Sequence, residues 1–345
     1  MKRLALVFAL ALAVGPWTAC KKRPEPPPAP ARPGLFVIGI FQSVDSPTAN
    51  EVRKGILRAL EDGGLRDGEN VLVRIRIANG DIAEVQRIAQ QFVAEKVNLL
   101  VPLSTQCLQA ALIAGRNVPI VFGSVATPFR VGAGRSPDDH LGHVTGVAST
   151  GPVRQAVQLI REVLPKAKRL GTLWTPTEVN SEYYLDLAKE AAAEAGLEVV
   201  AVPVGDSHDI PQAAQVLVNQ GIDALFPISD NTINSAFEVL GRLAAESRVP
   251  LFGGFLRSVE FGASAAVGFD FYEMGYRTGQ IVVRVMNGES PAHIPIQFMS
   301  DAQVHLNLDA AAKQGLSFPA AVLRRAARVL RVSPLQSSEP AAGIR

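Results

Sequence analysis

Short apolar runs alternate with amphipathic stretches along most of the chain. Residues 36–41 form an apolar run, and the stretch 48–62 has apolar residues at helical spacing before a Gly-Gly pair, a common end for a helix. The alternation continues with strands expected at 71–78, 99–103 and 119–125 and helices at 82–96 and 106–114. Strands that alternate with helices predict a parallel sheet with helices on both faces.

The same order of elements restarts near residue 169. The second set comprises strands at 169–175, 198–204, 224–228 and 250–255 and helices at 178–195, 210–220 and 232–247. Landmarks repeat too: NLLVPLSTQ at 98–106 corresponds to DALFPISDN at 223–231, and VPIVFG at 118–123 corresponds to VPLFGG at 249–254. This internal correspondence predicts an α/β protein with two similar Rossmann-like lobes, each built on a parallel sheet and joined by a hinge.

The predicted boundaries follow from this pattern and from the composition of the two ends. We expect a signal peptide at 1–19, a lipidated Cys20 with a Pro-rich tether at 20–34, a first lobe at 35–150, a second lobe at 151–270, C-terminal helices with a crossover strand at 271–331, and a disordered tail at 332–345. Part of 256–316 is expected to return to the first lobe across the hinge, with the strand at 294–299 as the returning element.

The first twenty residues indicate export. Lys2 and Arg3 precede an apolar run at 4–14 that is too short to span a bilayer, and small residues lead to Cys20. The segment WTAC at 17–20 resembles the lipobox of bacterial lipoproteins, in which the cysteine carries the lipid; an ordinary signal peptide that contains a cysteine is the alternative. We therefore expect an exported, membrane-anchored lipoprotein on the periplasmic or cell-surface side.

Charge and cysteine content exclude some classes of function. Six of the 34 basic residues and one of the 32 acidic residues precede residue 34, so the remainder carries 28 basic and 31 acidic residues. This slightly acidic balance gives no indication of nucleic-acid binding. If Cys20 is lipidated, Cys107 has no disulfide partner, and the stability of the fold must come from its core.

Polar residues follow the predicted strands in both halves, where open parallel sheets bind their ligands. The candidate ligand-binding residues are Gln42, Ser43, Ser104, Thr105, Ala126, Thr127, Asn180, Tyr184, Asp230, Asn231 and Asp270. Hydroxyls and helix N-termini suit a carboxylate, whereas Asp230 and Asp270 suit an ammonium group. Together they predict a zwitterionic ligand, that is, an amino acid. In the alternative interpretation each Ser, Thr or Asp only caps the helix that follows it.

Motifs for catalysis, metals or cofactors are weak or missing. The histidines of HLGH at 140–143 have a spacing seen in metal sites, but no Cys, Asp or Glu pattern completes one. GAGRSP at 132–137 follows no clean strand and lacks the third glycine of a dinucleotide fingerprint, and no G-x-S-x-G elbow occurs. We therefore predict no catalytic residue, no metal and no cofactor.

Several longer segments resemble one known family. SDNTINSAFE at 229–238, VPLFGGFLRSVEFGA at 249–263 and VGFDFYEMGYRTGQ at 267–280 resemble ABC-transporter substrate-binding proteins of the tryptophan/tyrosine-binding type. The segments 78–81, 118–128 and 142–150 do so too, and the resemblance covers about residues 35–316. It implies a type I periplasmic-binding-protein fold with a hinge between two lobes. It also implies a monomer without catalysis that captures a small ligand, with an aromatic amino acid as the leading candidate, and delivers it to an ABC permease driven by an ATPase.

The chain departs from the family pattern at two places. Phe255-Leu256-Arg257 stands where the family commonly has Asp-Thr/Ser-Asp, and Val44-Asp45-Ser46 stands where an aromatic residue or His is frequent. Two other functions remain as alternatives: a ligand-binding sensor or accessory lipoprotein that serves a signalling partner, and an enzyme on a similar scaffold. The first requires a fused signalling module and the second a nucleophile–base pair or metal cluster; the sequence shows neither.

Overall fold

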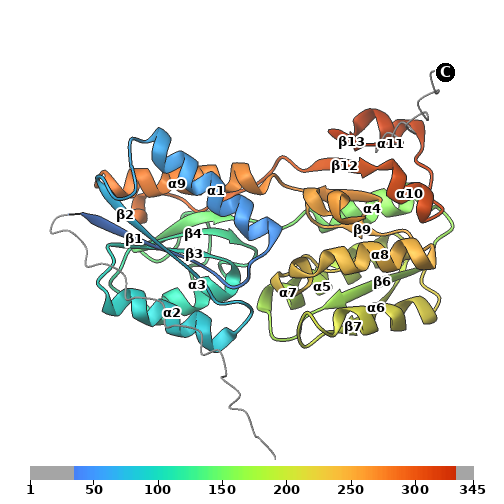
Figure 1. Ribbon diagram of the computed structural model, residues 1–345, viewed down its shortest axis with the longest axis horizontal. Coiled ribbons are helices and arrows are strands. Elements are labelled where there is room, and N and C mark those ends of the chain that lie inside the picture. The colour runs from blue at the N-terminus through green and yellow to red at the C-terminus, as the bar shows by residue number, and fades with distance from the viewer. Residues whose placement is uncertain (1–34, 332–345) are drawn as a thin grey trace, which may run out of the picture. The chain divides into compact units, whose positions relative to one another are not determined.

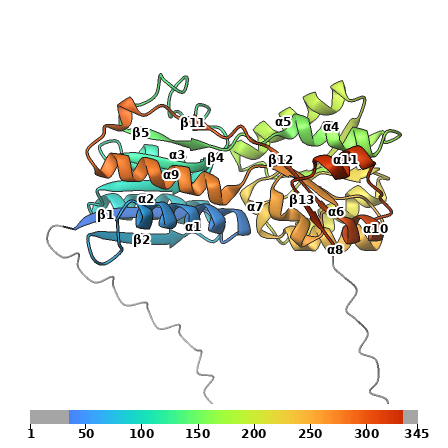
Figure 2. The same ribbon diagram turned by 90° about the horizontal axis from the view of Figure 1, so that it is seen from above.

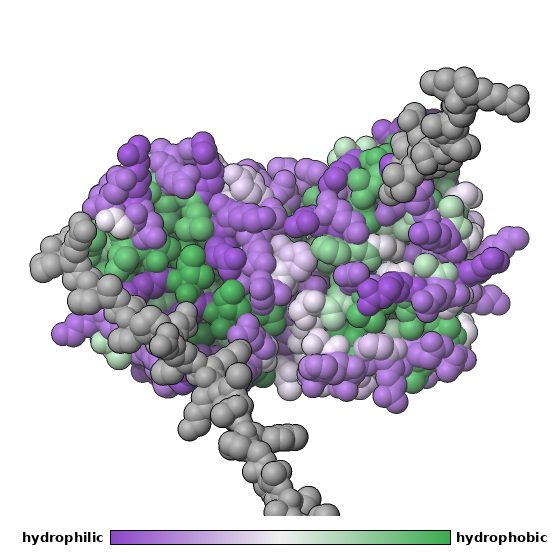
Figure 3. Space-filling view, in the orientation of Figure 1, coloured by the Kyte–Doolittle hydropathy of each residue, from purple (hydrophilic) through white to green (hydrophobic). Residues whose placement is uncertain are grey.

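The computed structural model describes residues 35–331 of the 345-residue chain. The predicted signal peptide, the lipidated Cys20, the tether and the C-terminal tail lie outside the described residues. Within the described part no helix has the length and apolar character needed to cross a membrane. In Figure 3, hydrophilic residues cover most of the visible face, and hydrophobic residues show between them over both lobes.

The first lobe is a six-stranded parallel sheet with helices on both faces. Its strands, in spatial order, are β11 (Gln297–Phe298), β5 (Val144–Ala148), β4 (Ile120–Val125), β3 (Leu99–Leu103), β1 (Phe36–Gln42) and β2 (Val71–Ile77). Helices α1 (Pro47–Asp62) and α9 (Phe271–Met286) lie side by side on one face, and α2 (Ile82–Ala94) and α3 (Thr105–Ala114) cover the other (Figures 1 and 2). A buried apolar core fills the space on each side of the sheet.

The second lobe contains two smaller sheets. The first is parallel, with β7 (Glu198–Pro203), β6 (Arg169–Trp174) and β8 (Ala224–Leu225) in that order. The second has the order β13 (Arg328–Leu330), β12 (Gln303–Asn307), β10 (Ala265–Gly268) and β9 (Phe252–Gly253). A parallel bridge between Leu225 and Leu251 links the two sheets.

The helices of the second lobe surround these sheets (Figure 1). They are α4 (Val153–Val163), α5 (Val179–Glu194), α6 (Ile210–Asn219), α7 (Asn231–Ser235), α8 (Phe237–Ser247), α10 (Leu308–Lys313) and α11 (Ala320–Arg325), with the 3₁₀ helix η1 (Leu256–Phe261). A second 3₁₀ helix, η2 (Pro291–His293), precedes β11. This architecture confirms the predicted α/β class with parallel sheets.

One strand pair runs against the predicted parallel order. The chain leaves β10 for α9 and the first lobe, and it returns from β11 to β12. Strand β10 runs toward the hinge, whereas β12 starts at the hinge and runs away from it. The two strands therefore pair antiparallel. The chain therefore passes between the lobes at 149–152, 269–270 and 299–302.

The predicted strand at 224–228 is shorter than expected, and the helix after it is interrupted. Only Ala224–Leu225 is regular strand, although the Phe226 and Ile228 amides still donate to β6 carbonyls. Pro227 lies between these two residues and has no N–H to donate. The expected helix at 232–247 is divided into α7 and α8 at Ala236, whose φ of −123° is not helical.

Candidate ligand-binding site

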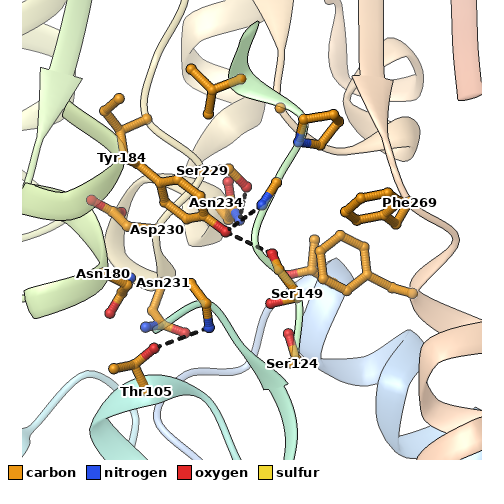
Figure 4. Close-up of a pocket in the computed structure, with 18 of the residues that line it drawn as sticks. Thr105, Ser124, Ser149, Asn180, Tyr184, Ser229, Asp230, Asn231, Asn234 and Phe269 are labelled. Carbon is orange, nitrogen blue, oxygen red and sulfur yellow. Dashed lines mark hydrogen bonds between the residues drawn. The ribbon is translucent and has the colours of Figure 1, made fainter. Parts of the chain in front are cut away.

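A cavity lies between the lobes, at the carboxyl ends of β3, β4 and β8 (Figure 4). Its polar lining from the first lobe includes Ser104, Thr105 and Ser124, and that from the second lobe includes Asn180 and Asp230. This is the edge at which open α/β sheets bind ligands, because the following helix N-termini point there. The polar ends of the two strand copies, at 104–105 and 229–231, thus form opposite walls of one cavity.

The wall from the first lobe is built of neutral hydroxyl groups. Ser104 caps α3 by accepting a hydrogen bond from the Cys107 amide at 3.2 Å. The Thr105 hydroxyl oxygen accepts from the Ala126 amide at 3.3 Å, which ties α3 to the end of β4. Ser104 and Ser124 have φ values of 148° and 57°, which are rare for residues with a side chain. Such backbone conformations are concentrated at functional sites, because the surrounding packing must hold them in place.

The wall from the second lobe is built around the Asp230 carboxylate, which is 2% exposed. Its Oδ1 accepts from the Ile233 amide at 2.7 Å, so the residue caps α7. Its Oδ2 accepts from the Ser181 hydroxyl at 2.7 Å, and that hydroxyl in turn accepts from the Thr175 amide. The capping role and the position in the cavity wall therefore coincide in the same residue.

Glu178 is not among the predicted site residues, yet it lies directly behind this wall and is fully buried. Its carboxylate accepts five hydrogen bonds, from the Asn180 side-chain amide, the Asn231 backbone and side-chain amides, and the Thr232 amide and hydroxyl, at 2.6–3.1 Å. An acid at the start of a helix usually faces solvent, so the sequence carried no signal for this role. Only the tertiary structure, which brings the start of α5 to the start of α7, places its carboxylate beside these donors.

The electrostatics of the cavity are dominated by these two acids. Burial, and then the negative charge of Glu178, raise the pKa of Asp230 well above its usual range. Burial likewise raises the pKa of the Tyr184 phenol, so that side chain is neutral. Among residues 35–331, no Lys, Arg or His lines the cavity. A cationic group is therefore the charged species that this wall favours.

Two carbonyl oxygens in the wall have no partner within the described protein. They are Oδ1 of Asn180 and Oδ1 of Asn234, whose residues are 4% and 6% exposed and line the cavity. The orientation of Asn180 is fixed from the other end, because its amide nitrogen donates to Glu178, whose carboxylate can only accept. The amide nitrogen of Asn234 donates to the Ser229 hydroxyl. Buried acceptors without a donor are costly, so a ligand N–H in the cavity would satisfy them.

Another part of the lining is formed by apolar side chains. Val153, Val267, Phe226, Phe269 and Phe271 line the cavity and are buried or partly buried. In Figure 4, Phe269 lies on the side away from Asn180 and Asp230. The cavity therefore offers polar groups to one part of a ligand and an apolar, aromatic surface to another, as small-molecule sites commonly do.

Tyr184 connects the cavity to a segment that passes between the lobes. Its hydroxyl donates to the Ser149 carbonyl at 2.7 Å and accepts from the Gly151 amide at 2.9 Å. Both partners belong to the passage from β5 to α4, and the tyrosine is 5% exposed. The phenol thus fixes the hinge segment and contributes to the cavity wall at once.

Replacing Tyr184 by phenylalanine is expected to lower the free energy of unfolding by about 1–2 kcal/mol, since a buried N–H and C=O each lose a partner. Urea unfolding followed by circular dichroism measures this. The control is Tyr183→Phe, because the Tyr183 hydroxyl makes no hydrogen bond within the described residues and its ring is only partly buried. Equal unfolding midpoints for the two variants would contradict the expectation.

The structure brings most of the predicted site residues to this cavity. Ser104, Thr105, Ala126, Asn180, Tyr184, Asp230 and Asn231 all line it. Four predicted residues are not in its lining. The Gln42 side chain is buried in hydrogen bonds to Val44, Asn50 and Arg53, Ser43 donates to the Ser104 hydroxyl from behind, and Thr127 is buried beyond the wall.

Asp270 is the fourth residue that does not line the cavity. Its carboxylate is exposed and caps α9 by accepting from the Tyr272 and Glu273 amides. This is the alternative interpretation of the sequence, in which the residue only caps the following helix. It lines a second cavity beside the start of α9. Asp270 is therefore not part of the first cavity, because its carboxylate lies at the start of α9 beside the second cavity.

The departure at 255–257 also lies outside the first cavity. Phe255 is buried in the core of the second lobe, and Arg257 lines the second cavity. Arg257 pairs with Glu51 of α1 at 3.2 Å and with Glu260 at 2.8 Å, so one ion pair joins the lobes. Because Arg257 is 42% exposed, this pair contributes little stability.

The protein has two α/β lobes that are connected by three chain passages, and a partly polar cavity lies between the ends of their sheets. These features define a solute-binding protein of the type I periplasmic class. Residues 37–330, almost all of the described chain, match the family described as "ABC transporter substrate binding protein". The chain belongs to this family, and it is the substrate-binding protein of an ABC transporter.

Known relatives are similar over most of their length. A tyrosine-binding protein of Clostridioides difficile (strain R20291) is 32% identical over 272 residues, 79% of this chain and 79% of that protein. An ABC domain from Streptococcus pneumonia in complex with L-Trp has a TM-score of 0.82 and 29% identity, covering 86% of this chain and all of that one. A ligand-free, open substrate-binding protein from Clostridium difficile has a TM-score of 0.64 and 30% identity, covering 86% of this chain and 99% of that one. The predicted resemblance is confirmed.

Proposed function

We propose that the protein captures an aromatic L-amino acid, tyrosine or tryptophan, between its lobes and delivers it to an ABC permease. The lipid on Cys20 and the Pro-rich tether hold it at the outer side of a membrane in this proposal. Support comes from the two relatives described as binding tyrosine and L-Trp, and from the chemistry of the cavity.

The observation that carries the proposal is the set of acceptors in the second-lobe wall. Asp230 supplies a carboxylate, and Asn180 and Asn234 supply carbonyl oxygens that have no partner among residues 35–331. An α-ammonium group has three N–H donors and one positive charge, which matches three acceptors of which one is an acid. These three residues therefore form the ammonium subsite of the proposal.

The opposite wall suits the other end of an amino acid. Ser104, Thr105 and Ser124 offer hydroxyls, and α3 begins at Thr105, so its N-terminal amides face the same region. Neutral donors at a helix N-terminus bind a carboxylate without a basic side chain. The phenyl rings of Phe269 and Phe271 then leave an apolar surface for an aromatic side chain.

The arrangement of the lobes supports capture by closure. At nearly equal identity, the chain matches the L-Trp complex with a TM-score of 0.82 and the open, ligand-free relative with 0.64. Residues 35–331 therefore resemble the ligand-bound arrangement more than the open one. A ligand that contacts both walls stabilises such an arrangement, because only the closed form offers it both sets of contacts.

A ligand panel tests the proposal. L-tyrosine or L-tryptophan at 100 times its dissociation constant is expected to raise the free energy of unfolding by about 2.7 kcal/mol, which thermal denaturation detects. Matched analogues probe each end: tyramine lacks the carboxylate, and 3-(4-hydroxyphenyl)propionate lacks the ammonium group. We expect the propionate to lose more affinity than tyramine, because no basic residue of the described cavity compensates its charge. The proposal is wrong if no amino acid of the panel changes the melting temperature.

A further inference from the structure

Glu178 is the feature of the site that the proposed function leaves unexplained. It does not line the cavity, yet five donors converge on its two buried oxygens. Four of these donors are N–H groups, which could not accept a hydrogen bond from a protonated carboxyl group. The environment is therefore built for an anion, although the residue is fully buried and no Lys, Arg or His within the described chain forms an ion pair with it.

The first consequence concerns the direction of the amides in front of Glu178. A carboxylate accepts only from the nitrogen end of an amide, so it holds Asn180 and Asn231 by their NH₂ groups. The Asn180 carbonyl oxygen is thereby turned away from Glu178 and has no partner in the described part of the chain. Replacing the acid by a glutamine would allow this amide to flip, since glutamine offers both a donor and an acceptor.

The second consequence concerns Asp230. Glu178 accepts from the Asn231 and Thr232 amides and Asp230 accepts from the Ile233 amide, so two carboxyl groups face the start of the same short helix. The other groups around Asp230 are neutral: Ser181 and Thr175 from the α5 side, Tyr184 with its raised pKa, and the hydroxyls of the opposite wall. Two acids so close together in a buried site do not both ionise readily.

We propose that Glu178 is a positioning residue that makes Asp230 hold a proton before a ligand binds, and that the incoming ammonium group displaces this proton. The Asp230 O–H bond breaks, the proton passes to water, and the ligand retains its own positive charge. Capture of each ligand molecule is then coupled to proton release, and the affinity for the ligand increases with pH. This inference rests on the proposed amino-acid ligand.

Isothermal titration calorimetry with L-tyrosine and L-tryptophan tests the coupling on the full chain. At about pH 6 the ligand's own amino group stays protonated, so it adds nothing to the proton count. Titrations in buffers of different ionisation enthalpy at one pH give the number of protons released per ligand bound. We expect up to about one proton, and a dissociation constant that falls by about tenfold per pH unit while Asp230 is protonated. Normal binding with no buffer dependence overturns the proposal.

The role of Glu178 is tested by Glu178→Gln, with Glu182→Gln on the exposed face of α5 as the matched control. Glu178→Gln is expected to release fewer protons and to shift the pH profile of the dissociation constant to lower pH. A purely structural role would weaken binding at every pH alike. An unchanged proton count in this variant, or a shift shared by Glu182→Gln, contradicts the assignment.

Two further readouts keep the outcomes separate. If neither amino acid binds the wild-type protein, the proposed function fails, whereas binding without proton release removes only the coupling. Should Glu178→Gln not fold, the pH dependence of the stability of Asp230→Asn decides whether Asp230 holds its proton more tightly in the folded protein than in the unfolded chain, as the coupling requires. That variant must gain stability over wild type as the pH rises, and a constant difference overturns the coupling.

Discussion

Replacing Asp230 by asparagine is expected to weaken the binding of L-tyrosine or L-tryptophan by about 100-fold or more, while the protein stays folded. The asparagine retains an oxygen for the Ile233 amide, which preserves the cap of α7. Its NH₂ group can donate to the Ser181 hydroxyl oxygen, in place of the bond that this hydroxyl donates to Asp230 in the wild type. It removes the charge, and no other acid lines the described cavity to neutralise the ligand's ammonium group. Calorimetric titration measures the loss.

The same variant is expected to be more stable than wild type at neutral pH. Burial and Glu178 raise the folded-state pKa of Asp230 above its ordinary value of 3.8. A carboxyl with a raised pKa stabilises the fold only while it is protonated, so its contribution is lost as the pH rises from 3.8 through the folded value. The gain from asparagine therefore increases with pH over this range and vanishes in acid.

The control for both effects is Asp186→Asn, which changes an exposed acid on α5 and should leave affinity and stability unchanged. If Asp230→Asn binds as tightly as the control, Asp230 only caps α7. If it is instead less stable than wild type at neutral pH, burial and Glu178 do not raise the pKa of Asp230 as described.

Replacing Gly275 by valine is expected to destabilise the protein by about 3 kcal/mol or more, because α1 and α9 are in backbone contact there. A Cβ on Gly275 would overlap the Val52 carbonyl oxygen, and one on Gly55 would overlap the Tyr272 carbonyl oxygen. One turn further along, a Cβ on Gly279 would lie 2.6 Å from the Ala59 side chain. The colliding atoms are largely backbone, so a rotamer change does not relieve the overlap.

Gly275→Ala makes the test sharper. In an isolated helix this change stabilises by about 1 kcal/mol, so intrinsic propensity and packing predict opposite signs. Packing dominates here, and we expect a lower urea midpoint for alanine and a still lower one for valine. The control is Gly142→Ala in an exposed loop, where the nearest atom to an added Cβ is 3.8 Å away. A stabilised Gly275→Ala would show that α1 and α9 lie further apart than described.

The alternation of strands and helices, and the repeat of NLLVPLSTQ as DALFPISDN, were sufficient to predict the two-lobed fold. These signals are local: apolar runs, helical spacing and turn residues are set by each segment's own burial. The antiparallel pairing of β12 with β10 was not predictable in this way, because it depends on how the chain returns from the first lobe. The division of the helix at Ala236 is likewise a consequence of tertiary context.

The residues of the candidate site were likewise predictable only in part. Asp230 and Thr105 were predicted because the carboxyl ends of parallel strands always meet at one edge of a sheet. Gln42 and Asp270 have the same sequence signal, yet hydrogen bonds to neighbouring residues hold them elsewhere. Whether a polar residue at a strand end faces a ligand depends on side-chain direction and on competing partners, and neither is visible in sequence.

The sequence by itself determined the fold class, the two lobes and the edge at which each presents polar groups, since these follow from patterns within single segments. Only the tertiary structure decided the character of the cavity. It placed neutral hydroxyls opposite Asp230, and it buried the carboxyl group of Glu178 among five hydrogen-bond donors. The physical reason is that the charge and orientation of a buried group are set by the burial and partners around it, and these come from segments far apart in the chain.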